Sequence, residues 1–172
     1  MGLISVSRRI ADVTVRESLG EEFVPIVKHL KRRRELSESE LSERFDGDVN
    51  YTRSLLYRLH SCSFVGFARK KDEKIGWYVY YWFLKYDQIY RSFFEMNQEK
   101  IAGLQRRLER ERKTMYFDCP DGCMRLDFDK GTEYCFKCPE CGCLMDPVET
   151  SKHVREIKKQ ISGIKAELKK TI

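Results

Sequence analysis

The chain has 172 residues, 35% of them charged, and a formal net charge of +6. This length leaves room for one ordinary domain or two small ones, and the charged share favours small units joined by exposed helices. The basic balance suits nucleic acid or an acidic protein surface, and it is too small to decide between them. No apolar run approaches the roughly 20 residues of a membrane-spanning helix, and none follows the first arginines as in a secretory signal. We therefore expect an intracellular protein without a membrane partner.

The first helices are expected to pack through apolar stripes. An amphipathic helix begins near Glu21 and repeats apolar residues at helical spacing as far as Leu30. A short second helix is predicted over residues 38–45, with Ser37 or Ser39 as its N-cap. The residues before Gly20 are expected to form either a short helix or an arm, and their pattern does not decide which.

A third helix and a hairpin follow. Asp48 or Asn50 is the predicted N-cap of the helix. Strands are predicted over residues 63–68 and 76–84, with a charged turn over residues 69–74 between them. This order of elements is that of a winged helix-turn-helix. The expected apolar stripe of the third helix comprises Tyr51, Leu55, Leu56 and Leu59.

The whole chain is predicted to have an α+β fold with four parts. A winged-helix domain over residues 1–85 is followed by a charged linker helix over residues 86–114. A zinc ribbon is expected over residues 115–148, and a coiled-coil-like helix over residues 149–172 that packs on the linker helix. The last helix is too short to be stable alone and needs such a partner. Its heptad seam comprises Val154, Ile157, Ile161, Ile164 and Leu168.

A cluster of cysteines predicts a metal site in the ribbon. The chain has seven cysteines, an odd number, and their clustering favours metal in a reducing compartment over disulfides. Two short loops, each with proline after its first cysteine, offer two thiolates apiece, and strands are expected over residues 124–128 and 133–136 between them. Four thiolates in a tetrahedron form a closed, structural Zn²⁺ site with no position for water. The predicted ligands of one zinc ion are Cys119, Cys123, Cys138 and Cys141.

Two further cysteines leave this ligand set open. Cys135 forms a second C-x-x-C pair with Cys138, and Cys143 lies two residues beyond Cys141. We favour Cys138 and Cys141 because their proline and glycine neighbours suit the turn that such a loop needs. Free cysteines without metal, or redox chemistry, are the alternative interpretations.

The third helix and the hairpin carry candidate contact residues. The helix offers Arg53 and Arg58, which suit either DNA phosphates or simple solvation of a protein-binding domain. Two acidic residues among the lysines of the turn reduce its net positive charge, which weakens a purely phosphate-binding interpretation. Alternation along residues 77–84 sends some rings into the core and leaves one or two for unpaired bases or a protein partner.

The motifs together resemble a known family. A winged helix ending in Gly76-Trp-Tyr-Val-Tyr-Tyr-Trp, a charged helix, and Phe136-Lys-Cys-Pro-Glu-Cys-Gly are similar to archaeal transcription factor E. That factor is the counterpart of the alpha subunit of eukaryotic transcription factor IIE. The resemblance covers about residues 20–144, although the first cysteine loop is C-x-x-x-C where the family usually has C-x-x-C. The chain ends at Ile172 without the long acidic extension of the eukaryotic subunit, which favours an archaeal protein.

The resemblance implies a general initiation factor without enzymatic activity. It would join promoter-bound RNA polymerase with TATA-binding protein and transcription factor B, in the cytoplasm on chromosomal DNA, and promote or stabilise promoter opening. It implies a monomer whose winged helix lies on the polymerase clamp near the melted non-template strand, with the zinc ribbon near the stalk. The residues expected to contact nucleic acid or polymerase are Arg53, Arg58, Lys70, Lys71, Lys74, Trp77 and Tyr78.

Two other functions remain compatible with the sequence. A dimeric winged-helix regulator would dimerise through the C-terminal seam and read a palindrome with its third helix. A winged-helix adaptor would make no contact with nucleic acid at all. The small basic set on the third helix, and the linker helix available to cover the seam, favour the initiation factor over the dimeric regulator.

Overall fold

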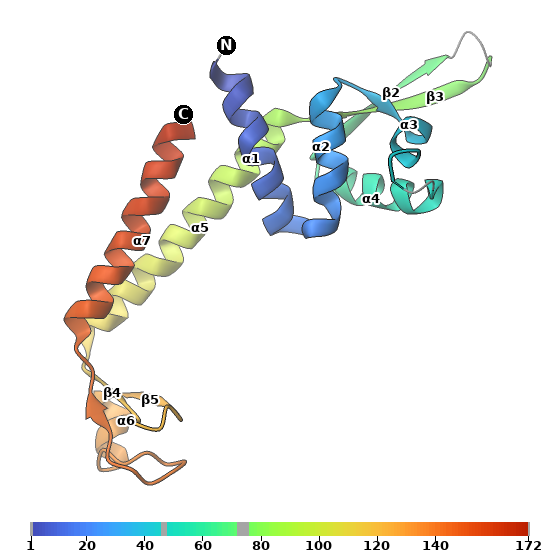
Figure 1. Cartoon of the computed structure of the whole chain (residues 1–172). Helices are drawn as coiled ribbons and strands as arrows, with labels where there is room; N and C mark the ends of the chain where they lie inside the picture. The colour runs from blue at the N-terminus through green and yellow to red at the C-terminus, as the bar shows by residue number, and fades with distance from the viewer. Residues whose placement is uncertain (1, 46–47, 72–75, 172) are drawn as a thin grey trace. The chain divides into compact units, whose positions relative to one another are not determined.

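The computed structural model describes residues 2–45, 48–71 and 76–171, with side chains described from Ile10 onward (Figure 1). It divides into two compact units, one reaching as far as Met96 and the other holding residues 97–170. Helix α5 spans Tyr86–Lys113 and therefore contributes to both. Each unit has its own buried apolar residues, and each is described by itself.

Before the sheet and the start of α5, the first unit contains four α-helices and a short 3-10 helix among its described residues. The region that the sequence left undecided, before Gly20, is an 18-residue helix whose Ala11 and Val15 are fully buried. The short 3-10 helix then leads into α2, which has Pro25 in its first turn, where proline is well tolerated. The helices are α1 (Gly2–Leu19), η1 (Glu21–Phe23), α2 (Val24–Arg32), α3 (Glu38–Ser42) and α4 (Val49–Ser61).

Side-chain caps fix where α3 and α4 begin. The Ser37 hydroxyl accepts from the Glu40 backbone N–H at 3.2 Å, and the Glu40 carboxylate accepts from the Ser37 N–H at 2.9 Å. This reciprocal pair is a capping box, which satisfies two backbone donors at once. The Asp48 carboxylate accepts from the Tyr51 N–H at 3.0 Å. Of the caps that the sequence offered, the structure therefore selects Ser37 and Asp48.

A three-stranded antiparallel sheet completes the winged helix; it contains the predicted hairpin and adds a short strand, β1, that the sequence did not predict. Its strands are β1 (Leu36–Ser37), β2 (Val65–Lys71) and β3 (Tyr78–Leu84), in the order β1-β3-β2. Phe67 lies opposite Trp82, and Lys71 lies opposite Tyr78. The sheet and helices enclose one core, whose largest fully buried side chains include Trp82, Phe23, Ile26, Leu36, Leu41, Leu56 and Leu59.

The expected stripe of α4 is wrong at one position. Tyr51 is 45% exposed, whereas Thr52 is fully buried and its hydroxyl donates to the Asp48 carbonyl at 2.9 Å. Positions 52, 55, 56 and 59 follow the three–four spacing of one helix face, and Tyr51 lies one residue off it. The Tyr51 ring therefore points away from the core.

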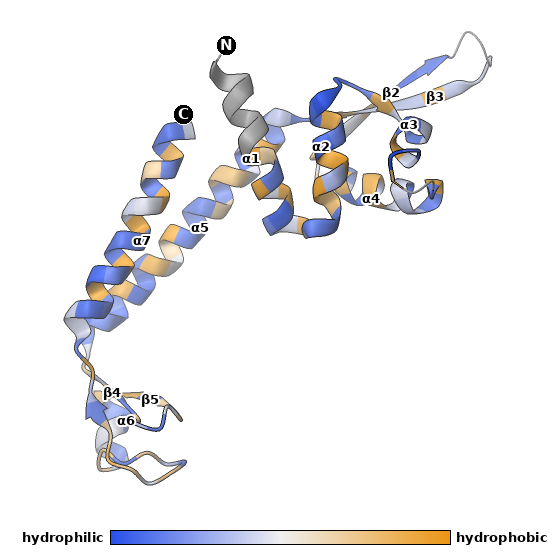
Figure 2. Cartoon of the chain, in the orientation of Figure 1, coloured by the Kyte–Doolittle hydropathy of each residue, from blue (hydrophilic) through white to orange (hydrophobic). Residues whose placement is uncertain are grey.

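The second unit contains α7 (Thr150–Thr171) as well as the end of α5. Along α7 the seam residues Ile157, Ile161 and Leu168 are buried, and Figure 2 shows apolar residues recurring among hydrophilic ones on both helices. The predicted packing of α7 on the linker helix over their length stays a prediction. No helix within the described ranges is long and apolar enough to cross a membrane.

The ribbon differs from its predicted form in one strand. Strand β4 (Tyr116–Asp118) pairs with β5 (Arg125–Asp127) and β6 (Asp146–Pro147). Strand β5 is the first expected strand, over residues 124–128. The second expected strand, over residues 133–136, is wrong, because helix α6 (Phe128–Glu133) ends at Glu133 and residues 134–136 form a turn. The Asp127 carboxylate caps this helix by accepting from the Lys130 N–H at 3.0 Å.

An aromatic contact explains why the chain turns after α6. Cys135 and Phe136 both have left-handed backbones, with φ of 51° and 55°. This turn places the Phe136 ring 4.7 Å from the Phe117 ring and directly over Gly131. A Cβ on Gly131 would lie 3.0 Å from the Phe136 ring, so glycine leaves the space for it.

Candidate metal centre and wing surface

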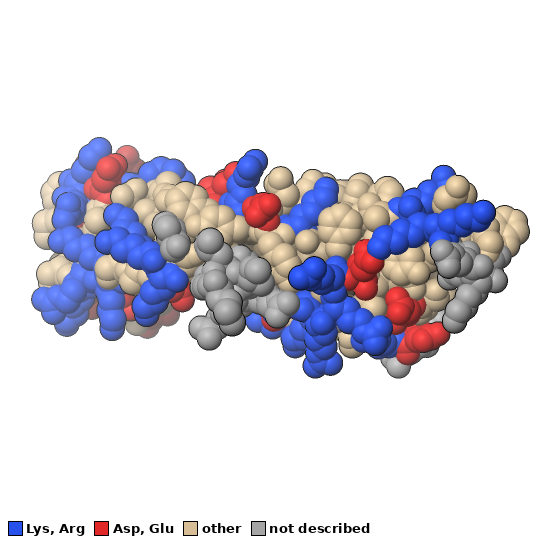
Figure 3. Space-filling view, turned by 90° about the horizontal axis from the view of Figure 1, so that it is seen from above, with Lys and Arg blue, Asp and Glu red and all other residues tan. Residues whose placement is uncertain are grey.

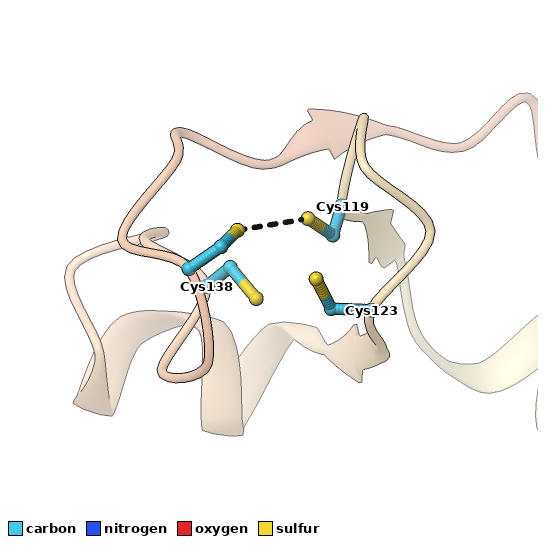
Figure 4. Close-up of side chains that lie close together, drawn as sticks. Cys119, Cys123 and Cys138 are labelled. Carbon is cyan, nitrogen blue, oxygen red and sulfur yellow. Dashed lines mark hydrogen bonds between the residues drawn. The ribbon is translucent and has the colours of Figure 1, made fainter.

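Four cysteine side chains meet between two loops of the ribbon. The sulfurs of Cys119, Cys123, Cys138 and Cys141 all lie within 4.8 Å of one another. Figure 4 shows Cys119 and Cys123 on one loop and Cys138 on the other, with their side chains directed toward one another. Cys119 and Cys138 are buried, and the other two are exposed. These four thiols lie close enough together to hold a metal ion, and their softness suits Zn²⁺.

The first loop follows β4 and closes on itself through the backbone. The Cys119 N–H donates to the Met124 carbonyl at 3.0 Å, and the Gly122 N–H donates to the Cys119 carbonyl at 2.9 Å. Gly122 has a φ of 72°, a region that favours glycine. The C-x-x-x-C spacing, a departure from the usual family pattern, therefore forms a regular turn that brings both thiols to the cluster.

The second loop has the same design. The Gly142 N–H donates to the Cys138 carbonyl at 2.7 Å, and Gly142 has a φ of 77°. The Cys138 N–H in turn donates to the Cys143 carbonyl at 2.8 Å. Gly122 and Gly142 therefore form the turns of the two cysteine loops.

The thiols titrate as a group. The Sγ atoms of Cys119 and Cys141 are 3.4 Å apart, so they share one proton. Burial opposes ionisation of Cys119, but hydrogen bonds from the backbone N–H of Cys123 and from the neighbouring thiols lower its pKa to about 7. At Cys141 the Cys143 N–H favours the thiolate, yet the proton shared with Cys119 and burial raise the pKa above its usual range. A metal cation would replace the protons that hold these sulfurs together.

The two competing cysteines lie in different surroundings. Cys135 is exposed, on the left-handed turn after α6, and the four-cysteine cluster does not include it. Cys143 is half-buried, and its Sγ donates to the Asp121 carboxylate at 3.2 Å. The four sequence-predicted ligands are thus brought together, and their role in binding metal stays a proposal.

The winged helix exposes a continuous set of aromatic rings, which we call the aromatic face. Phe67 lies at its centre, with ring centroids 5.4 Å from Tyr80, 5.4 Å from His60 and 5.3 Å from the buried Trp82. The Arg69 guanidinium lies 4.0 Å above the Tyr78 ring and adds a cation to this surface. The exposed members of the aromatic face are Tyr57, His60, Phe67, Tyr78 and Tyr80.

Of the contact residues suggested by the resemblance, the aromatic ones are well exposed. Trp77 is 75% exposed and Tyr78 is 56% exposed. Lys71 is also exposed, while Lys74 lies outside the described residues. At the hairpin end, beside the grey residues at the right of Figure 3, basic side chains lie next to uncharged surface.

The arginines of α4 and one wing lysine are engaged by carboxylates. Arg53 pairs with Glu38 at 3.0 Å, and Arg58 pairs with Glu22 at 3.3 Å. Lys70 pairs with Glu35 from the loop before β1. These partners come from distant parts of the chain, so the sequence pattern gave no sign that the basic set is partly neutralised.

Comparison with known proteins identifies the family. The sequence profile described as TFIIE alpha subunit matches residues 9–114, more than half of the chain. The chain belongs to the TFIIE alpha subunit family. It is 33% identical to the transcription factor E of Pyrococcus horikoshii over 151 residues, which cover 87% of this chain and 78% of that protein. This is a family of transcription factors and not of enzymes, as the sequence motifs implied.

Further relatives come from other archaea. Transcription factor E of Methanobrevibacter smithii is 32% identical, with 87% of this chain and 86% of the relative covered. Transcription factor E of Cenarchaeum symbiosum is 32% identical, with 88% and 90% covered. These matches extend beyond the profile, which ends at residue 114, before the first cysteine of the ribbon.

The family motifs did not single out most of the aromatic face. Tyr57 and His60 lie on α4 and Phe67 on β2, and it is the packing of α4 on the sheet, with Trp82 opposite Phe67, that places their rings together. One signal in the sequence could have been used. Phe67, Arg69 and Lys71 are two residues apart, so on a strand they share one face, which places an aromatic ring beside two basic side chains.

Proposed function

We propose that this protein is a general transcription initiation factor that joins the archaeal RNA polymerase pre-initiation complex. In this role it acts with TATA-binding protein and transcription factor B, in the cytoplasm on chromosomal DNA, and it promotes or stabilises promoter opening. Membership of the TFIIE alpha subunit family supports this proposal. The observation that carries it is the exposure of two aromatic rings at the hairpin, where Trp77 is 75% exposed and Tyr78 is 56% exposed.

The side chains of the winged helix favour melted DNA over duplex DNA as the ligand. Reading a major groove requires free donors on α4, yet Arg53 and Arg58 each pair with a glutamate. Exposed rings next to cations suit unpaired bases instead, because every base has a face on which an aromatic ring can stack. Tyr78, with Arg69 above it, offers both features at one point.

The placement of the two units on the polymerase is part of the proposal. The winged helix contacts the clamp near the melted non-template strand, and the ribbon contacts the stalk, with one copy of the chain in each complex. Lys71, Trp77 and Tyr78 are the wing contacts supported by their exposure. The remaining proposed contacts are Arg53, Arg58, Lys70 and Lys74.

The metal centre completes the ribbon in this account. Cys119, Cys123, Cys138 and Cys141 hold one Zn²⁺ ion, which their spacing and their chemistry support. All four positions are filled by sulfur, so the ion supplies folding energy and no chemistry. The ribbon in turn presents a fixed surface to its partner.

Co-purification with the polymerase tests the proposed function. Tagged protein should retain the polymerase, and removal of the stalk subunits should weaken but not abolish retention, because the winged helix keeps its clamp contact. Light scattering after size exclusion should give a monomer. A stable dimer that protects a palindromic operator without polymerase would instead support the sequence-specific regulator. Failure to bind premelted promoter DNA even with polymerase present would support the adaptor.

A further inference from the structure

The ribbon holds a fifth thiol beside the four-cysteine cluster. The Sγ of Cys143 donates to Oδ2 of Asp121 at 3.2 Å. The ligand atoms of Asp121, Cys141 and Cys143 all lie within 4.8 Å of one another. Cys141 therefore belongs to two groups of metal-ligating side chains, the four-cysteine cluster and this second one.

The cluster has a fixed side and an accessible side. Cys119 and Cys138 are buried, with exposures of 5% and 1%, and backbone hydrogen bonds hold both of their loops. Cys141 is exposed and precedes Gly142, whose backbone is left-handed. A change of ligand at Cys141 therefore leaves the buried half of the shell in place.

We propose that Cys143 is a reserve ligand of the metal centre, which takes the position of Cys141 when that thiolate is lost. The inference rests on the proposed zinc centre and adds to it a residue outside both C-x-x-C-type loops. Cys143 is tied to the same loop as the cluster, because its carbonyl accepts from the Cys138 N–H at 2.8 Å. It follows Cys141 by two residues, so the exchange needs only a local movement of the exposed turn.

The exchange conserves the number of zinc–sulfur bonds. The bond between zinc and the Cys141 sulfur breaks, and a bond between zinc and the Cys143 sulfur forms. The proton of Cys143 passes to the Asp121 carboxylate, which already accepts its hydrogen bond, and from there to the released Cys141 thiolate or, if that residue is substituted, to water. No electron is transferred, and the ion would have four thiolates before and after the exchange.

Cys135 provides a matched comparison. It is as near to Cys138 in sequence as Cys141 is, but it is exposed on the turn after α6. Among the described residues, neither metal-ligating group includes Cys135. If Cys143 were only a nearby cysteine, its removal would affect zinc binding no more than removal of Cys135; if it is a reserve ligand, its removal should cost zinc binding once Cys141 is absent.

Metal content and affinity of full-length variants test the proposal. Zinc is measured by mass spectrometry of the metal and by competition with a chromophoric chelator. Cys141→Ala should keep one zinc ion with an affinity reduced about 10–100-fold, the scale on which disturbed outer-shell contacts act. The double variant Cys141→Ala/Cys143→Ala should lose the ion under the same conditions. Cys141→Ala/Cys135→Ala should behave like Cys141→Ala alone.

Cobalt substitution gives a second readout that counts sulfur ligands directly. The thiolate-to-cobalt charge-transfer band of Cys141→Ala should match the wild-type band in intensity, and it should be weaker in the variant that also lacks Cys143. Equal zinc affinity and equal band intensity in these two variants would overturn the reserve-ligand role. Wild-type protein that binds no zinc would overturn the zinc centre itself, and with it this inference.

Discussion

The guanidinium of Arg125 and the carboxylate of Glu111 form a bidentate pair at 3.0 and 2.8 Å, joining β5 of the ribbon to the end of α5. The Glu111 side chain is only 5% exposed, and that of Arg125 is 27% exposed. The Tyr116 ring lies 4.2 Å from the guanidinium and covers it. A parallel pair of charge-assisted hydrogen bonds fixes direction as well as distance, so it anchors the ribbon on the helix from which it emerges.

Removing one charge of this pair should loosen the ribbon. Glu111→Gln leaves the half-buried Arg125 guanidinium facing a weaker, uncharged acceptor, which should lower the local free energy of opening by about 1–3 kcal/mol. The readout is hydrogen exchange of the amides in β4 and β5, because local opening is measured there directly. Glu149→Gln is the control, since the pair of Glu149 with Lys152 is exposed and should cost roughly 0–1 kcal/mol. Equal effects of the two variants would contradict the anchoring role.

The capping box at Ser37 makes a prediction that separates two neighbouring serines. Ser37→Ala removes the acceptor of the Glu40 N–H and should destabilise the winged helix by about 1 kcal/mol. Ser39→Ala, inside the same helix, should be close to neutral because alanine favours helix interiors. Urea unfolding followed by the fluorescence of the buried Trp82 measures both. A larger loss at Ser39 than at Ser37 would mean that α3 begins elsewhere.

Metal removal should unfold the ribbon and spare the winged helix. Zinc sites of this kind contribute on the order of 10–16 kcal/mol in model peptides, more than so small a unit can replace. With chelator, limited proteolysis should cut within the ribbon, while the core around Phe23 and Trp82 stays protected. Cys138→Ser should reproduce this pattern without chelator, and Cys62→Ser, outside the ribbon, should not. A ribbon that resists protease in chelator would mean that metal is not its main support.

Zinc affinity should fall as the solution becomes more acidic. The pKa of Cys119 lies at about 7 in the metal-free protein, and the other thiols share their protons with it. Each bound proton competes with the ion, and because the pKa of Cys141 is raised above its usual range, the affinity should already fall with decreasing pH above the pKa of Cys119 and continue to fall below it. Chelator competition at a series of pH values measures the slope. An affinity that does not change with pH would exclude thiolate ligands.

His29 should make the winged helix sensitive to acid. Burial, followed by the charges of Arg44 and Arg32, lowers the pKa of His29, whose ring packs edge-on against Phe45. The unfolded chain binds the proton at the ordinary pKa of about 6.5, so stability should fall as the pH drops from there toward the lower folded pKa. His29→Leu should flatten this dependence in thermal unfolding between about pH 7 and pH 5.5. An unchanged slope would assign the acid sensitivity to other groups.

The sequence predicted most of the architecture because the decisive signals were local. Apolar periodicity and strand composition defined the winged helix, and the linker helix ends at Lys113, close to its expected end. The choice between Ser37 and Ser39 needed the structure, because both serines can cap a helix that begins nearby. Tyr51 and Thr52 are adjacent at the start of α4, and one turn of apolar spacing does not show which of the two lies on the buried face.

The ribbon shows where local signals fail. Residues 133–136 have strand-like composition, yet the Asp127 cap and the packing of Phe136 on Phe117 and Gly131 produce a helix and a turn. The glutamates that engage Arg53 and Arg58 are likewise 15 and 36 residues away in sequence. Contacts of this kind come from tertiary packing, and a pattern read along one chain does not contain them.

Permanganate reactivity of promoter thymines tests the central claim most directly. Wild-type protein should increase the reactivity of the melted region on duplex promoters bound by polymerase. Trp77→Ala, or Lys70 and Lys71 changed to glutamate, should reduce that increase more than they reduce polymerase binding, and the defect should shrink on a premelted template. Tyr134→Ala, which removes an exposed ring of the ribbon, should lose no more reactivity on duplex than on premelted DNA. Equal losses for the wing variants on duplex and premelted promoters would contradict the proposed role of the wing in opening.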